Sequence, residues 1–315
     1  DLKYVQEEFT TFCKNQQLKK ALLSSVDLLK AGDFDGIKYL VESALKAGND
    51  KNVGHEYNKD IETRFREDAR TTISTPWSRI DELLQGGLGN GDFGLIFGNP
   101  GGGKSWSLVA LGGHAVKMGY NVIHYTLELG EAYVGRRYDA FFSQIPVDKI
   151  LQNRDKVEDI IPQLPGELII KEFPTGSASV LTLRNHIEKL MLKSFAPQLI
   201  IIDYADIMRS TRRFDSLRHE LKLIYEELRN LSMELSIPIW TASQSNKEGS
   251  TSNVVGLENM SEAYGKAMVA DVVVTLSRKP EEKAKGTARL FVAKNRAGKD
   301  GILFPLHIDT AMSRF

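Results

Sequence analysis

Short apolar runs alternate with longer amphipathic stretches along most of the chain. The short runs are rich in strand-forming residues and lie at 93–97, 121–126, 167–171, 199–202, 238–242 and 272–276. Stretches with apolar residues at helical spacing lie between them, at 106–118, 131–142, 147–164, 179–193 and 216–235. This alternation predicts an α/β fold with a mostly parallel, twisted central sheet and helices on both faces. The last two runs, 288–293 and 303–308, predict a hairpin.

Residues 1–48 show helical spacing of apolar side chains in two stripes. The first stripe comprises Leu22, Leu23, Val26 and Leu29, and the second comprises Ile37, Leu40, Val41 and Leu45. Between the stripes, Gly32 suits a helix C-cap and Asp33 or Asp35 suits an N-cap. Two helices cannot enclose a core alone, so these residues pack either on the main domain or on a neighbouring subunit.

The segment 49–74 is polar and densely charged, which is typical of an extended linker. Apolar residues that indicate an ordered core begin again at Trp77 and Ile80. We therefore expect the chain to consist of N-terminal helices at 1–48, a linker at 49–74 and a main α/β domain at 75–315.

The composition limits the class of protein but does not by itself indicate one function. Of the 315 residues, 42% are hydrophobic and 26% are charged, as in an ordinary globular protein. The formal net charge is zero, so nucleic-acid binding would depend on local basic patches. The single cysteine, Cys13, fits a reducing compartment, and no apolar run could span a bilayer. We expect a cytoplasmic location and no membrane partner. The chain begins with Asp1 rather than Met, so a domain preceding it is left open.

The segment Gly98–Ser105 reads G-N-P-G-G-G-K-S and fits the phosphate-loop pattern G-x-x-x-x-G-K-[ST]. It lies between a predicted strand and a predicted helix, which is the context that this motif requires. Its glycines let backbone N–H groups approach phosphates, and the helix adds its positive dipole end. Lys104 would reach the β- and γ-phosphates, and the Ser105 hydroxyl would bind Mg²⁺. We assign nucleotide binding to Gly98, Asn99, Pro100, Gly101, Gly102, Gly103, Lys104, Ser105 and Trp106.

Carboxylates follow two other predicted strands, at the edge where open α/β sheets bind ligands. Asp203 ends the run 199–202 and suits a Mg²⁺ ligand, although an aspartate in this place can also cap a helix. Glu128 follows the strand at 121–126 and could polarise an attacking water. Its neighbour Glu131 suits the start of a helix, where the dipole favours a carboxylate.

Gln244 ends the strand that begins at 238, and its amide could sense a γ-phosphate and pass that state to the following loop. That loop, about 245–260, is rich in Gly, Ser and Asn and long enough to indicate function. Its candidate DNA contacts are Asn246 and Lys247. A second basic loop follows Asp203; its arginines could hold a nucleic-acid backbone or form a solvated helix start. They are Arg209, Arg212, Arg213 and Arg218, of which the first three are the candidate DNA contacts.

Lys294 and Arg296 end the strand near 293 and precede the glycine turn at Gly298. A cation pair on a rigid strand could reach a γ-phosphate, and if it served a neighbour's site it would act as an arginine finger in trans. Ordinary surface charges on a hairpin turn remain the alternative.

Together these motifs resemble the RecA-type ATPase domain of DnaB-like replicative hexameric helicases, most closely the replicative helicases of T-even-type phages. The resemblance covers most of residues 75–315. It is carried by the phosphate loop, by Y-T-L-E-L at 125–129, I-I-I-D-Y at 200–204, T-A-S-Q at 241–244, K-N-R-A-G at 294–298 and I-I-K-E-F-P-T-G at 169–176.

The resemblance implies a catalytic set of Lys104, Glu128, Gln244, Lys294 and Arg296, with ATP as substrate and Mg²⁺ held by Ser105 and Asp203. It implies a homo-hexamer in the cytoplasm of a bacterium or a phage-infected host. The loops after Asp203 and Gln244 would grip single-stranded DNA in a central channel, and the N-terminal helices would dock on the adjacent subunit.

One difference from the resembled family concerns the N-terminus. Members carry a further domain that meets the primase, and there is no room for it ahead of Asp1, so primase or loader contact stays open. Two other functions share the same core. A RecA-like recombinase would form filaments, and an ATP-gated assembly or signalling ATPase would hydrolyse ATP without responding to DNA.

Overall fold

A computed structural model of the protein describes residues 15–16, 18–26, 28–30, 32–34, 36–37, 40–41, 44, 57–59, 71–212, 214, 216–244 and 264–315. The chain divides into two compact units, 1–69 and 70–315. The second unit begins before the expected position 75, because β1 (Thr72–Ile73) pairs with β2 (Leu88–Gly89). No helix among the described residues is both long and apolar enough to cross a membrane.

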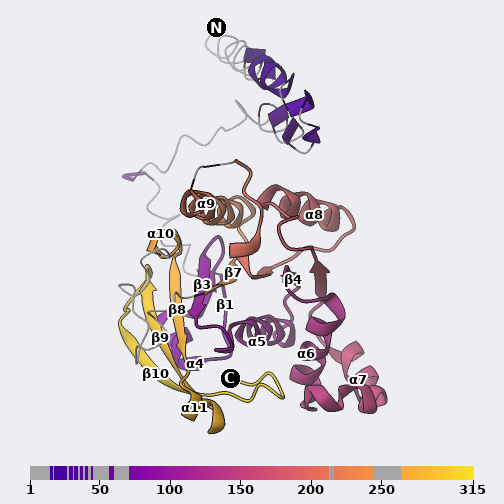
Figure 1. The fold of residues 1–315 in the computed structure, drawn as a ribbon, viewed down its shortest axis with the longest axis vertical. Coiled ribbons are helices and arrows are strands. Elements are labelled where there is room, and N and C mark those ends of the chain that lie inside the picture. The colour runs from indigo at the N-terminus through magenta and orange to yellow at the C-terminus, as the bar shows by residue number, and fades with distance from the viewer. Residues whose placement is uncertain are drawn as a thin grey trace. The chain divides into compact units, whose positions relative to one another are not determined.

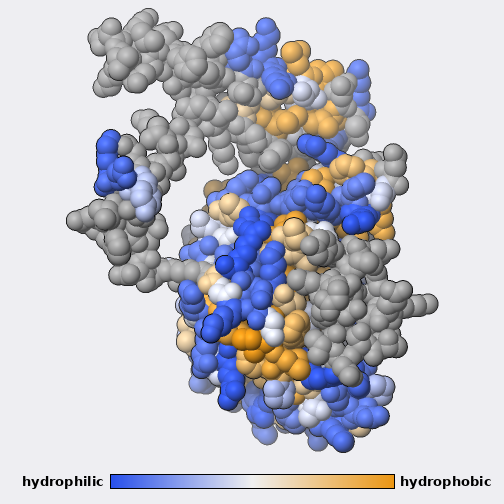
Figure 2. Space-filling model, turned by 90° about the vertical axis from the view of Figure 1, so that its left-hand side faces the viewer, coloured by the Kyte–Doolittle hydropathy of each residue, from blue (hydrophilic) through white to orange (hydrophobic). Residues whose placement is uncertain are grey.

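The described part of the first unit is helical on either side of a break at Gly32, as expected. Gly32 has a left-handed φ of 70°, and the Asp33 carboxylate accepts a hydrogen bond from Gly36 N at 2.9 Å. Asp33 therefore caps the second helix, while Asp35 lies outside the described residues. Figure 2 shows hydrophobic surface on this unit beside hydrophilic residues. The described helical residues of this unit expose Leu22, Leu23, Val26, Leu29 and Phe34.

The second unit is organised around an eight-stranded sheet with the order β10-β9-β8-β3-β7-β6-β4-β5. The strands from β8 to β5 run parallel, β9 pairs antiparallel with β8, and β10 pairs antiparallel with β9. Their bounds are β3 (Phe93–Gly98), β4 (Val122–Thr126), β5 (Leu168–Glu172), β6 (Leu199–Asp203), β7 (Ile239–Gln244), β8 (Val272–Ser277), β9 (Thr287–Asn295) and β10 (Ile302–His307). The predicted strand order along the chain and the C-terminal hairpin are confirmed.

Helices cover both faces of this sheet (Figure 1). One face carries α8 (Val180–Leu192), α9 (Leu217–Leu235) and α10 (Tyr264–Val269). The other carries α5 (Lys104–Lys117) and α6 (Glu131–Ser143). The remaining helices are α4 (Ser78–Leu83), α7 (Arg154–Ile160) and α11 (Pro280–Ala284), with 3₁₀ turns η1 (Val147–Asn153), η2 (Ile161–Gln163) and η3 (Ala205–Ile207).

The helical stretch expected at 147–164 is interrupted: η1, α7 and η2 follow one another there. Because α7 buries no side chain, tertiary packing does not impose one continuous helix on this segment. Pro162 lies inside η2, at a position where it would also disturb an α-helix.

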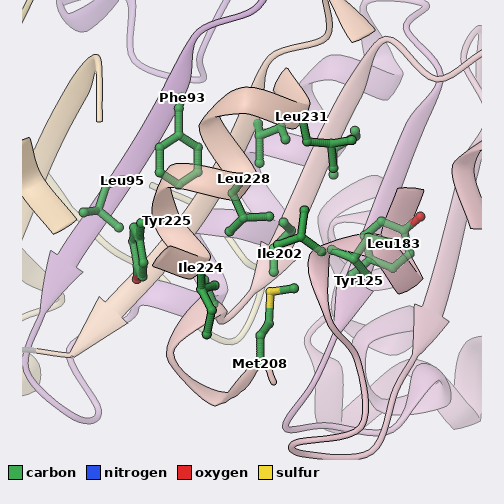
Figure 3. Close-up of a cluster of buried hydrophobic side chains, with 14 of the residues drawn as sticks. Phe93, Leu95, Tyr125, Leu183, Ile202, Met208, Ile224, Tyr225, Leu228 and Leu231 are labelled. Atoms are coloured by element: carbon green, nitrogen blue, oxygen red, sulfur yellow. The ribbon is translucent and has the colours of Figure 1, made fainter. Parts of the chain in front are cut away.

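The core consists of two layers because the inner parallel strands β8, β3, β7, β6 and β4 are buried on both faces, whereas the edge strand β5 is only partly buried. Phe93, Leu95 and Phe97 of β3 pack on the side of α8 and α9, whereas Ile96 packs on the side of α5. Figure 3 shows the first layer, where Leu228 and its neighbours on α9 face the strands. This pattern explains why the strands read as continuous apolar runs rather than alternating ones.

Gly94 in β3 leaves space for the indole of Trp240 in β7. A Cβ at Gly94 would lie 2.4 Å from the Trp240 ring, which is 2% exposed and cannot move into solvent. We therefore expect Gly94→Ala to lower the free energy of unfolding by about 1–3 kcal/mol, the usual cost of overpacking a core. Chemical denaturation would measure it.

Gly135→Ala in α6 is the matched control, because an added Cβ there meets only Ile170 at 3.9 Å. Alanine favours a helix over glycine, so this variant should be as stable as the wild type or more so. Equal stability of the two variants would contradict the proposed packing role of Gly94.

Candidate nucleotide site

The carboxyl ends of four neighbouring strands bring the predicted nucleotide residues to one edge of the sheet. Gly98 at the end of β3 pairs in register with Gln244 at the end of β7. Asp203 at the end of β6 pairs in register with Thr126 at the end of β4, and Glu128 follows Thr126 closely in the chain. The spacing in sequence is large, so this convergence is a product of the parallel topology.

The phosphate loop has the backbone form that its glycines permit. Gly101 and Gly103 have left-handed φ values of 66° and 108°, and Gly103 is the N-cap of α5 without a capping side chain. The first N–H groups of α5 are therefore available to an anion. The ammonium of Lys104 folds back to donate to the carbonyl oxygens of Gly98 at 2.8 Å and Asn99 at 3.0 Å.

Lys104 and Asp203 are charged groups held out of water, with 8% and 2% of their surface exposed. Burial lowers the pKa of the Lys104 ammonium to about 8, and the charges of Asp203, Asp206 and Glu128 oppose this shift. Burial raises the pKa of the Asp203 carboxyl to about 6, against a hydrogen bond from the Ser105 side chain. A buried lysine and a buried carboxylate beside it are well suited to phosphates with a bound cation.

The residues present fit Mg²⁺ as well as a nucleotide. The Ser105 hydroxyl and the Asp203 carboxylate are hydrogen-bonded to each other, and hydroxyl and carboxylate oxygens are the ligands that this ion prefers. No cluster of three or more His, Cys, Asp or Glu side chains that could hold a metal by itself exists among the described residues. An ion at this place would thus depend on phosphate oxygens for further ligands.

The two candidate carboxylates after β4, Glu128 and Glu131, differ in their interactions with the rest of the protein. Glu131 accepts hydrogen bonds from Glu172 N at 2.8 Å and from Lys171 Nζ at 3.2 Å, and these lower the pKa of its carboxyl. Glu128 is exposed, and its charge acts on Lys104 and Asp203. Glu131 is thus engaged with the end of β5, and Glu128 is the carboxylate of the two whose charge acts on Lys104 and Asp203.

Arg137 in α6 is a site residue that the sequence analysis missed. Its guanidinium lies 4.2 Å from the ring centroid of Trp106, and its charge acts on Asp203 and Glu128. Nη1 of Arg137 is buried without a hydrogen-bond partner. A signal existed in the sequence: Arg137 interrupts the apolar stripe of α6 between Val134 and Tyr138, both buried.

Lys294 and Arg296 lie at the opposite edge of the sheet. Lys294 pairs in register with Val273 near the start of β8, and its ammonium donates to Met268 O at 2.8 Å. Arg296 forms an ion pair with Asp271 at 3.0 Å. The structure therefore does not bring this pair to the phosphate loop of its own chain.

The DNA-binding candidates are only partly described. Arg209 and Arg212 are exposed in the loop after β6, and Gln244 is exposed at the end of β7. Arg213, Asn246 and Lys247 lie outside the described residues.

The fold and this site define a RecA-like P-loop ATPase core. The chain belongs to the family described as the DnaB-like helicase C-terminal domain, whose family model matches residues 72–315. The fold class and the family expected from the sequence are both confirmed.

Individual relatives agree with this assignment. The chain is 28% identical over 283 residues to the DnaB-like replicative helicase of Enterobacteria phage T4, covering 85% of this chain and 60% of that protein. It is 26% identical over 252 residues to a replicative DNA helicase DnaB of Leifsonia xyli subsp. xyli, covering 75% and 54%. The chain thus spans between half and two thirds of these curated relatives.

A solved structure of a DnaB-like replicative helicase, described with its interactions with primase, has the same fold. The TM-score is 0.70 at 16% identity, covering 98% of this chain and 78% of that one.

The raised pKa of Asp203 predicts that the stability of the fold depends on pH. The carboxyl titrates near 6 in the folded protein against an ordinary value of 3.8, so its ionised form destabilises the fold. This loss of stability is absent at a pH below the ordinary pKa. It grows as the pH rises between the ordinary and the folded pKa, and it is complete above the folded pKa. Asp203→Asn should therefore raise the free energy of unfolding at pH 8 by at most about 3 kcal/mol.

Denaturation at pH 4 and pH 8 measures this difference. The gain should vanish at pH 4, where wild-type Asp203 is protonated in the folded state. Asp300→Asn removes the same charge from an exposed loop and should change stability little at either pH. A gain for Asp203→Asn that does not depend on pH would refute the burial penalty.

Proposed function

We propose that this chain is the ATP-hydrolysing motor of a ring-forming replicative DNA helicase that moves on single-stranded DNA and separates duplex. The observation that carries the proposal is the convergence of Lys104, Ser105, Asp203 and Glu128 at one sheet edge, while Lys294 and Arg296 lie at the opposite edge. A site divided in this way is complete only between two copies of the chain. Membership in a helicase family supports the same conclusion.

In this proposal the chain holds ATP through the N–H groups at the start of α5 and through Lys104. Bound Mg²⁺, held by Ser105 and Asp203, would supply positive charge to the β- and γ-phosphates. Glu128 orients a water and takes its proton as the water oxygen attacks the γ-phosphorus. The bond from the γ-phosphorus to the bridging oxygen breaks, leaving ADP and phosphate. Arg137, with its unpaired Nη1, supplies further positive charge at the site.

Lys294 and Arg296 of one copy would stabilise charge on the transferred phosphoryl group in the adjacent copy's site. Gln244 would report the presence of the γ-phosphate to the loops after β6 and β7, which would hold the DNA backbone. The ring would be a homo-hexamer, and primase or a helicase loader would be further partners; the solved relative described with primase supports the first of these.

The first test is the ATPase rate of the assembled protein with and without single-stranded DNA, together with its mass and an unwinding assay. We expect a hexamer-sized particle with turnover strongly stimulated by single strands. Lys104→Ala should abolish turnover, whereas Lys156→Ala on the exposed surface of α7 should not. Turnover of an assembled ring that ignores DNA would favour a gated assembly ATPase, and filaments on DNA would favour a recombinase.

The second test addresses the division of the site between copies. Arg296→Ala should fold normally, because Asp271 keeps its ion pair with Arg229 at 2.9 Å. We expect nucleotide binding to persist while turnover falls roughly 10³-fold, the usual effect of losing an arginine finger. Lys299→Ala in the same exposed turn is the control. Normal turnover of Arg296→Ala in an assembled ring would refute the role in trans.

A further inference from the structure

A buried polar cluster lies beside the nucleotide site and is not part of it. The carboxylate of Asp206, in η3, accepts from Lys266 Nζ at 2.6 Å, from Ser243 Oγ at 2.7 Å and from the Tyr225 hydroxyl at 2.8 Å. Lys266 Nζ also donates to Ser243 Oγ at 3.2 Å. The side chains of Lys266 and Asp206 are only 9% and 15% exposed. Each member thus has its partners inside the cluster.

This cluster joins the segments that carry two of the nucleotide residues. Asp206 follows Asp203 in the chain, and Ser243 precedes Gln244. The backbone N–H of Gln244 also donates to Asp206, at 3.4 Å. The same carboxylate therefore holds both the loop after β6 and the end of β7, and any displacement of Gln244 changes the hydrogen bonds that Asp206 makes.

Lys266 extends this connection to α10. Its stem packs near α9, with the ammonium 5.5 Å from the ring centroid of Tyr225, whose hydroxyl end is drawn in Figure 3. The described residues contain a groove of about 620 Å³ along α9 and α10, lined by Lys266 and by further polar side chains of α9. These are Arg218, His219, Lys222 and Glu226. A shift of α10 against α9 would change the spacing of the cations in this groove.

Electrostatics gives a second route between the cluster and the phosphate loop. The negative charge of Asp206 acts on the buried Lys104 as well as on Lys266. Binding of polyphosphate beside Lys104 adds negative charge close to Asp206. In a medium of low dielectric constant, such a change alters the balance between Asp206 and its remaining cation, Lys266.

We propose that the ion pair between Asp206 and Lys266 is a positioning device that couples the nucleotide state at Gln244 to the placement of α10 and hence to DNA affinity. The inference rests on the proposed motor function. In the proposed motor Gln244 would meet the γ-phosphate, Ser243 and Asp206 would carry its displacement, and Lys266 would move α10 relative to α9. Neither Asp206 nor Lys266 contacts substrate, so both act through other residues.

The test uses the whole chain as an assembled ring and fluorescent single-stranded oligothymidine as the probe. The measured quantity is the ratio of DNA dissociation constants with ADP and with a non-hydrolysable ATP analogue. In Lys266→Met we expect this ratio to fall at least about fivefold, the lower end of typical allosteric coupling. The KM for ATP in the absence of DNA should stay within about twofold of the wild type, because coupling is reciprocal and acts on nucleotide binding only when DNA is bound as well.

Lys222→Met is the matched control. Lys222 lines the same groove but pairs with Glu226 at 3.5 Å and has no contact with Asp206. Its loss removes one cation of the groove but no hydrogen bond of the cluster, so the ratio should stay unchanged. Ser243→Ala is a second variant that removes one cluster bond without changing charge, and it should lower the ratio in the same direction as Lys266→Met.

The outcomes separate the two proposals. If wild-type DNA affinity depends on nucleotide but both Lys266→Met and Ser243→Ala keep the ratio, the coupling role is overturned. If Lys266→Met lowers thermal stability and both affinities by the same factor, the cluster is only structural and the inference is again overturned. If wild-type affinity for DNA is independent of nucleotide, the motor function itself is overturned.

Discussion

Two buried charges, Lys104 and Asp203, impose the main constraint on this molecule. Each is removed from water at the carboxyl ends of the strands. Burial favours the neutral form of both groups, because it lowers the pKa of Lys104 and raises the pKa of Asp203. Such a site persists only where rigid surroundings prevent water from entering. The two apolar layers on β3 and β6 provide that rigidity, since every side chain of both strands is buried. The stability of the core is thus used to hold a site that is unfavourable in the absence of ligand.

The same constraint explains why the bonds of Lys104 stay within the loop. Its ammonium donates hydrogen bonds to Gly98 O and Asn99 O. These neutral carbonyl oxygens bind a cation less strongly than phosphate oxygens would, but their dipoles stabilise the buried charge. The guanidinium of Arg137 lies 4.2 Å from the ring centroid of Trp106, with one nitrogen unpaired. Both cations are positioned before any anion arrives, so little reorganisation is needed when one binds.

The sequence predicted the parts of this structure that depend on local pattern. The phosphate loop, the strand ends at Asp203 and Gln244, and the Gly32 break follow from residue types and spacing over short segments. The Asp206–Lys266 pair could not be found in this way, because it depends on the packing of elements far apart in the chain. For Arg137 the local pattern held only the interruption of an apolar helical stripe, and its place beside Trp106 also depends on that packing. The irregular segment 147–164 was misjudged for a related reason: helical spacing exists there, but too little burial accompanies it to fix one helix.

The strand β3 connects the two edges on which the proposed divided site depends. At its start, Phe93 N donates to Asp271 at 3.0 Å, and Asp271 also pairs with Arg229 and Arg296. At its end, Gly98 opens the phosphate loop of the same chain. A short, fully buried strand does not bend easily. In the proposed ring, the cation that one copy would offer to a neighbour is therefore joined rigidly to the loop that would receive a cation from the other neighbour. In a ring of such chains, a displacement at one interface would be passed to the next through β3, without any flexible segment between them.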